Sequence, residues 1–248
     1  MEQIVTIEEE YTLPSKGLMY AKPFDPTVKL RSMTVADEMR RLSQTKTPFK
    51  QMADLIESCL LTKLPIPVYD LNMCDYTFLL HKLRITTYGS NYTLRAYCPH
   101  CDSVVSSEIN LEDIPVKVYD KSMKDDFTVT LPKSGKVIQL RLQTPRDCDT
   151  IALKAKEHEE ETGEDITPLL NVSSHIKSID GTPLNSILFM EEIKRWSAYD
   201  FTYLVQKIEN IEKKVGLDSI VKVECPKCHN TIDITFRYTE EFFRPHID

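Results

Sequence analysis

Apolar residues recur at two different spacings along the chain, and the spacing changes twice. After Asn72 and again after Ser197, apolar side chains lie three or four positions apart, which predicts amphipathic helices (Phe78, Leu79, Leu83; Leu204, Ile208, Ile211, Val215). Gly89 and Gly216 are predicted to end these helices. The period then becomes two, in TLRAY at 93–97 and IVKVE at 220–224, and again in the residues that follow each CPxC sequence. Each helix is therefore expected to lead into a β-hairpin.

Helix starts are marked by capping residues. Thr34 and Thr144 each follow an alternating, strand-like segment and stand three residues before an acid, Asp37 or Asp147, as in a capping box. Pro145 occupies the first helical position, where its missing N–H has no consequence. The later helices have the N-cap candidates Asn72 and Ser197, the acids Asp75 and Asp200, and the hydrophobic-staple pairs Leu71/Tyr76 and Trp196/Phe201.

These signals belong to a repeat. LPSKG at 13–17 recurs as LPKSG at 131–135, VKLRSMTVAD at 28–37 as IQLRLQTPRD at 138–147, and NMCDYTFLL at 72–80 as SAYDFTYLV at 197–205. The second copy contains extra polar sequence, EHEEETGED at 157–165, which predicts a solvated helix end or loop. We therefore expect an α+β fold of two tandem repeats, 1–116 and 117–248, related by a pseudo-twofold axis, with hairpins that could form a joint sheet.

Each predicted hairpin has a CPxC sequence at its tip, CPHC in the first copy and CPKC in the second. Two thiolates are half of what a closed tetrahedral zinc site needs, and a pseudo-twofold axis would bring both tips together. The expected ligands of one zinc ion are Cys98, Cys101, Cys225 and Cys228. Alternatively, each hairpin could find its partner in another chain. The neighbouring histidines, His100 and His229, could substitute as ligands, although exposed loop positions are the preferred interpretation.

A closed four-thiolate site has no open position for water or substrate, and we find no other catalytic constellation, so no enzyme and no small-molecule substrate are expected. The rival interpretation is a dithiol oxidoreductase. Its reactive cysteine would begin a helix, whereas strand-like sequence follows both CPxC motifs.

Composition and charge limit the classes of function that remain. The net charge of −7 would repel a phosphate backbone, and basic residues near the motifs alternate with acids, so no nucleic-acid binding is expected. A transcription-related zinc-ribbon protein that binds nucleic acid nevertheless remains the alternative. No apolar run approaches the roughly 18 residues of a membrane span, so no membrane contact is expected. Cys59, Cys74 and Cys148 fit buried thiols in a reducing cytoplasm.

Several segments resemble one family, the T4-type bacteriophage baseplate hub and hub-assembly proteins. They are LPSKGLMY at 13–20, VKLRSMTVADEMRRL at 28–42, ADLIESCL at 53–60 and DLNMCDYTFLLHKLRITTYG at 70–89, which leads into YCPHC. The resemblance implies a protein of the host bacterial cytoplasm that helps the hub of a contractile-tail baseplate to form. It acts either as a hub component, and so also in the virion, or as an assembly factor or chaperone.

The resemblance implies other baseplate hub proteins as partners, and the oligomeric state is left open. The N-terminal TIEEEYTLPSKGLMY and the C-terminal EEFFRPHID are candidate contact segments. Packing of both segments against their own domain is the preferred interpretation.

Overall fold

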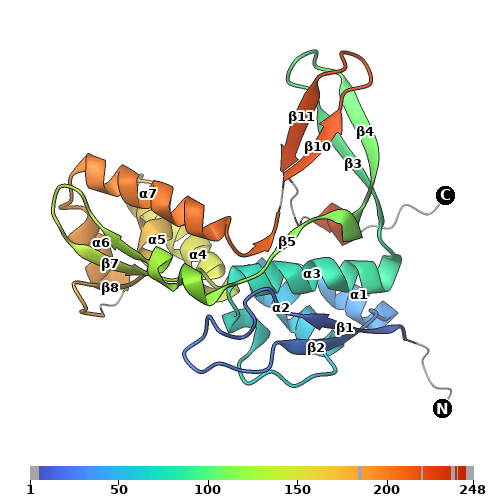
Figure 1. Ribbon diagram of the computed structural model, residues 1–248, viewed down its shortest axis with the longest axis horizontal. Helices are drawn as coiled ribbons and strands as arrows, with labels where there is room; N and C mark the ends of the chain where they lie inside the picture. The colour runs from blue at the N-terminus through green and yellow to red at the C-terminus, as the bar shows by residue number, and fades with distance from the viewer. Residues whose placement is uncertain (1–5, 184–185, 219, 236–237, 239, 244–248) are drawn as a thin grey trace.

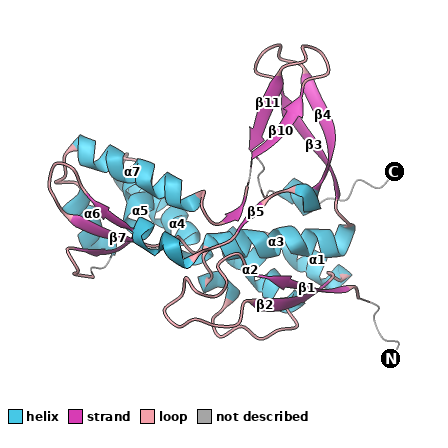
Figure 2. Cartoon of the chain, in the orientation of Figure 1, coloured by secondary structure: helices cyan, strands magenta, loops and turns pink. Residues whose placement is uncertain are grey.

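The computed structural model describes residues 6–183, 186–218, 220–235, 238 and 240–243, and it has an α+β fold, as predicted (Figure 1). Its helices and strands form three groups. One group contains the N-terminal strands and helices, a second contains most of the C-terminal half, and two hairpins project together from the same side of the molecule (Figure 2).

The N-terminal group is built on a small antiparallel sheet covered by helices. Its elements are β1 (Glu8–Thr12), β2 (Thr27–Arg31), α1 (Val35–Arg41), α2 (Pro48–Cys59), the 3₁₀ turn η1 (Val68–Asp70) and α3 (Met73–Tyr88). Leu13, Leu30 and Leu79 are fully buried between sheet and helices. The N-terminal segment thus packs against its own domain, which was the preferred interpretation.

The second group has a three-stranded sheet in the order β6-β7-β8. Its elements are η3 (Lys121–Phe127), β6 (Thr128–Thr130), β7 (Val137–Leu140), α4 (Pro145–Thr162), α5 (Thr167–Ser174), β8 (Ile176–Ile179), α6 (Ser186–Ile193) and α7 (Ala198–Glu212). Ile138 and Leu204 are fully buried in its core. The acidic run at 157–165 is the exposed end of α4 and the loop after it, as predicted.

The projecting hairpins are β3 (Asn91–Tyr97) with β4 (Val104–Asn110), and β10 (Ile220–Glu224) with β11 (Thr231–Thr235). They form two separate two-stranded sheets, so the expectation of a joint sheet is wrong for the described residues. At their base, β5 (Val116–Lys117) pairs with β9 (Gly216–Leu217), and η2 (Leu111–Asp113) and η4 (Glu240–Phe243) lie nearby (Figure 1).

Three of the four predicted side-chain caps are present. Thr34 and Thr144 form capping boxes with their acids, and the Ser197 hydroxyl accepts a hydrogen bond from the backbone N–H of Asp200. Asn72 is the N-cap residue of α3, as predicted, but its side chain makes no capping bond, and its amide nitrogen donates to the Met19 carbonyl instead.

Of the two glycines that were predicted to end helices, only one does so. Gly89 ends α3 with a positive φ of 82°, as predicted. Gly216 does not end α7, which stops at Glu212; it lies in β9 with a φ of 107°. A Cβ atom on Gly216 would lie 3.0 Å from the Cβ atom of Cys74, so packing between two elements requires the glycine there.

The two LPxxG segments are held by the same kind of contact. The Asp75 carboxylate on α3 accepts a hydrogen bond from the backbone N–H of Ser15 at 2.9 Å. The Asp200 carboxylate on α7 accepts one from the backbone N–H of Lys133 at 2.8 Å and one from that of Ser134 at 3.0 Å. The third residue of α3 thus fixes the turn between β1 and β2, and the third residue of α7 fixes the turn between β6 and β7.

The strand-to-helix segments also match in their hydrogen bonds. The Arg31 guanidinium donates to the next residue's carbonyl and to Asp37 at 2.7 Å. Arg141 likewise donates to the carbonyl of its neighbour and to Asp147 at 2.7 Å. Both arginines therefore join the end of a strand to the capping box of the following helix.

The described part of the C-terminal segment, residues 240–243, packs against its own chain, and residues 244–248 of that segment lie outside the described residues. The rings of Phe242 and Phe243 are buried, and the Arg84 guanidinium donates to the carbonyls of Phe242, Gly89 and Asn91. Arg84 thereby joins the end of α3, the start of the first hairpin and residues 240–243, which agrees with the preferred interpretation for this part of the segment.

Candidate metal centre

The two hairpin tips have the same backbone geometry. In the first tip, the N–H of Asp102 donates to the Cys98 carbonyl at 2.9 Å, and in the second the N–H of His229 donates to the Cys225 carbonyl at 2.9 Å. Asp102 and His229 each follow the second cysteine of their motif and adopt left-handed φ values of 55° and 56°. Each tip thus turns its two cysteine side chains to one side.

The tips meet, and the four sulfur atoms lie within 4.8 Å of one another. Across the hairpins, Cys98 Sγ is 3.6 Å from Cys228 Sγ, and Cys101 Sγ is 3.7 Å from Cys225 Sγ. Four thiolates bound tetrahedrally to zinc at about 2.3 Å would be about 3.8 Å apart. The cluster therefore has the donor type, donor number and spacing that fit a zinc ion, and these four cysteines could hold a metal.

The surroundings of the sulfur atoms favour thiolates at two of the positions. A hydrogen bond with the Ser103 hydroxyl, assisted by backbone N–H groups of the second tip, lowers the pKa of the Cys225 thiol to about 6. The same hydroxyl lowers the pKa of Cys101. Burial raises the pKa of the Cys98 thiol to about 11, so this sulfur would need a cation beside it to ionise at neutral pH.

Burial of the cluster is uneven. Cys98 and Cys225, the first cysteine of each motif, have no exposed surface, whereas Cys101 and Cys228 are half-buried. The neighbouring histidines do not join the described cluster. His100 is exposed, and the exposed His229 places its Nδ1 atom 3.0 Å from Glu224 instead.

Sequence reasoning missed two side chains that contact the sulfur atoms. The Ser103 hydroxyl lies 3.0 Å from Cys101 Sγ and 3.4 Å from Cys225 Sγ. The amide nitrogen of Asn230 donates to Cys228 Sγ at 3.5 Å. Both residues stand two positions after the second cysteine of their motif. The presence of a polar residue at this position in both copies could have indicated a contact with the sulfur atoms.

The remaining cysteines take no part in the cluster. Cys59 and Cys74 are buried, as predicted, whereas the same prediction is wrong for Cys148, which is only half-buried and lies near the sulfur atom of Met73. Burial raises the pKa of the Cys148 thiol to about 12, which disfavours a reactive thiolate.

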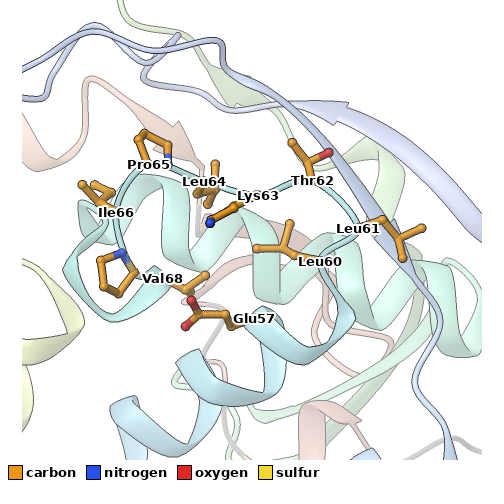
Figure 3. A pocket seen from close by; sticks show the side chains of 10 residues that line it. Glu57, Leu60, Leu61, Thr62, Lys63, Leu64, Pro65, Ile66 and Val68 are labelled. Atoms are coloured by element: carbon orange, nitrogen blue, oxygen red, sulfur yellow. The ribbon is translucent and has the colours of Figure 1, made fainter.

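Among the described residues, the four cysteines are the one group of three or more His, Cys, Asp or Glu side chains placed to hold a metal ion. The end of α2 and the loop after it border a hollow of about 410 Å³ lined by residues 57 and 60–68 (Figure 3). Its side chains are mostly aliphatic, with Glu57 and Lys63 as its charged groups, and these described residues include no histidine or cysteine. Within the described part of the chain, no helix is long and apolar enough to cross a membrane.

A comparison with protein families identifies the family of the chain, which the geometry of the cysteine cluster does not. A family model described as T4 bacteriophage base plate protein matches residues 4–244, nearly the whole chain. The chain belongs to this base plate family. The comparisons with curated proteins and with solved structures found no match.

Family membership indicates a role in the phage baseplate and contact with other baseplate proteins, as the sequence resemblance implied. It also suggests association with the virion tail. The four clustered cysteines are then a candidate metal centre in a baseplate protein.

Proposed function

We propose that this base plate family member acts in assembly of the baseplate hub, as a hub component or as an assembly factor, without catalysing a reaction. The match of the base plate family over residues 4–244 carries the proposal. The family resemblance of the N-terminal half supports the hub in particular. Its place of action would be the host bacterial cytoplasm, and also the finished tail if it is a hub component.

The ligands in this proposal are Cys98, Cys101, Cys225 and Cys228, and the metal is zinc. Thiolate sulfur favours zinc over the hard cations magnesium and calcium, and four sulfur atoms fill the tetrahedral coordination of zinc. Such a site stabilises structure, since no coordination position remains for a substrate. Deprotonation of the buried Cys98 would accompany binding of the metal.

The proposed site has a clear structural role. A two-stranded hairpin is at best marginally stable in water, and here two of them stand apart from the sheets below. Bonds from one metal ion to both tips would join residues more than a hundred positions apart in the chain. The metal would thus stabilise a paired-hairpin surface that can contact another hub protein.

The proposed architecture is a repeat of 1–116 and 117–248, with one hairpin in each copy. It is supported by the matched contacts of Asp75 and Asp200 with the LPxxG turns and by the matched pairs Arg31/Asp37 and Arg141/Asp147. The equal left-handed positions in the two cysteine turns add further support.

Purification of the tagged chain from infected cells before lysis tests the proposal. We expect it in a stable complex with other baseplate proteins, and we expect Cys225→Ser to reduce that complex while Cys148→Ser does not. Mass spectrometry of finished virions then separates a hub component from an assembly factor. A wild-type chain that is recovered alone at every stage of infection would refute a role in hub assembly.

A further inference from the structure

A hollow of about 320 Å³ lies in the second group of elements, where α4, α5, β8 and α6 meet. Its buried lining is mainly apolar and comes from two separate hydrophobic clusters. Ile151 and Leu170 belong to one cluster, and Ile176 and Phe189 belong to the other. Sites for small ligands have volumes of about 300–1,000 Å³, so this hollow has room for one large side chain.

The charged residues that line the hollow are mostly cationic. Lys154 on α4 and Lys177 on β8 are exposed, and the half-buried Arg141 follows directly after β7. Asp147 is the one carboxylate among the described lining residues, and both of its oxygens accept hydrogen bonds from the Arg141 guanidinium, at 2.7 Å and 2.9 Å. Neither lysine forms an ion pair within the described part of the chain. The hollow therefore has two cations beside it without a counter-ion.

The first copy of the repeat joins the matching elements directly. Leu60 bridges to β2 as Ile176 pairs with β7, so Ser58 at the end of α2 corresponds to Ser174 at the end of α5. The Arg31 guanidinium donates to the Ser58 carbonyl at 2.8 Å. This hydrogen bond ties the end of the strand to the end of the helix in the first copy.

The second copy differs at this place in both contacts and charge. The Arg141 side chain donates to its neighbour's carbonyl and to a carboxylate, and it makes no hydrogen bond to any described residue of α5. The same alignment places Lys177 where the first copy has Leu61, and Lys154 where it has Gln44. The missing tie between strand and helix thus coincides with two additional cations, the arrangement that a site for an anionic ligand requires.

We infer that this hollow is the docking site for an acidic segment of another baseplate protein. A large apolar side chain of that segment enters the hollow, and carboxylates on either side of it pair with Lys154 and Lys177. A nucleic acid fits less well, because the net charge of −7 repels phosphates and the buried lining is apolar. The comparison of the copies rests on the repeat proposed above, and the origin of the segment in the baseplate rests on the proposed function.

The acidic run of this chain, residues 157–165, does not fit the hollow. It follows Lys154 on α4, but none of its residues lines the hollow. A second copy of the chain could offer the same run, EHEEETGED, which contains no large apolar side chain. Two chains that each have a net charge of −7 also repel one another. A different protein with both apolar and acidic side chains is therefore the better partner.

Three fluorescently labelled synthetic peptides test the inference. The first has a leucine with two aspartates on each side, the second has lysines in place of the aspartates, and the third has serine in place of the leucine. Fluorescence anisotropy with the full-length chain should show at least ~tenfold tighter binding of the first peptide than of either other. An exposed ion pair contributes up to about fivefold to affinity, and burial of a leucine contributes more than about tenfold.

Lys154→Glu and Lys177→Glu should each weaken binding of the first peptide at least ~fivefold. Lys156→Glu is the matched control, because Lys156 is an exposed lysine of α4 that does not line the hollow, and its substitution changes the net charge equally. It should leave the affinity unchanged. All three lysines are exposed, and circular dichroism checks that the variants fold.

Equal binding of the three peptides, no binding of the first, or equal effects of the three glutamate substitutions would overturn the inference. Tighter binding of a duplex DNA than of the first peptide would overturn it in favour of a nucleic acid. A dimer in sedimentation equilibrium that Lys177→Glu dissociates would overturn it in favour of a second copy. The peptide assay requires no other baseplate protein and no metal, so its failure is distinguishable from the absence of a complex in infected cells.

Discussion

Stability should fall in mild acid because of one buried histidine. His81 on α3 has no exposed surface, and its Nε2 atom lies 2.8 Å from the Leu111 carbonyl. A carbonyl only accepts hydrogen bonds, so Nε2 carries the hydrogen, and Nδ1 is left to accept from the Tyr238 hydroxyl at 3.4 Å. The neutral imidazole thus satisfies both contacts, whereas a protonated ring would have to donate at Nδ1.

The magnitude follows from the pKa of His81 in the folded and unfolded chains. Burial, the largest cause, together with the charges of Lys82 and Arg84 lowers the folded pKa from 6.5 to about 4, although the hydrogen bond with the Leu111 carbonyl opposes the shift. Between these values the unfolded chain binds more protons than the folded chain, so the free energy of unfolding decreases as pH falls. The loss amounts to about 2 kcal/mol at pH 5 and about 3 kcal/mol below pH 4.

Urea denaturation of wild type and His81→Gln at pH 7.5 and pH 5 measures this loss. Glutamine can donate to the Leu111 carbonyl but does not titrate, so the variant should lose about 2 kcal/mol less between the two pH values. Other titrating groups, including the cysteines, contribute equally to both proteins and cancel in the comparison. An identical pH dependence of the two proteins would refute the reasoning.

Three further substitutions test particular contacts. Ser103→Ala should weaken metal binding about 10- to 100-fold in competition with a chelating dye, because the hydroxyl contacts two of the sulfur atoms. Gly216→Ala should lower the free energy of unfolding in urea by about 3 kcal/mol, since it combines a φ of 107° with a close approach to Cys74. Phe242→Ala should lower it by about 3–5 kcal/mol in the same assay, because its ring is fully buried.

Each of these three substitutions has a matched control variant. Ser106→Ala, in β4 away from the tip, should leave metal affinity unchanged, and an equal effect of Ser103→Ala would rule out a role of its hydroxyl at the sulfur atoms. Gly135→Ala has a φ of 71° but open space around its Cβ position, so a loss of only about 1 kcal/mol is expected. Phe242→Leu should retain most of the stability that Phe242→Ala loses; equal losses would argue against packing as the cause.

Local signals in the sequence predicted most of the helix starts and both hairpins. The capping boxes at Thr34 and Thr144 are hydrogen bonds within three residues, so the sequence contains both partners. The alternating segments before Cys98 and Cys225 likewise pair with strands only a short turn away. Such features depend little on the rest of the fold.

The failed predictions depend on distant contacts. The N-cap position of Asn72 was predicted, but the partner of its side chain is the distant Met19, and the role of Gly216 is set by the distant Cys74. Ser103 was missed for a similar reason, because one of its sulfur contacts, Cys225, lies in the other hairpin. Residues two positions after a CPxC motif would be the place to look for such contacts in a related sequence.

The central claim is that one metal ion joins two hairpins from distant parts of the chain. Native mass spectrometry of purified wild type, Cys225→Ser and Cys148→Ser, with zinc counted per chain, tests it most directly. We expect one zinc ion per wild-type chain, its loss or marked weakening in Cys225→Ser, and its retention in Cys148→Ser. A wild-type chain without zinc, or zinc that persists unchanged in Cys225→Ser, would contradict a site shared by the two hairpins.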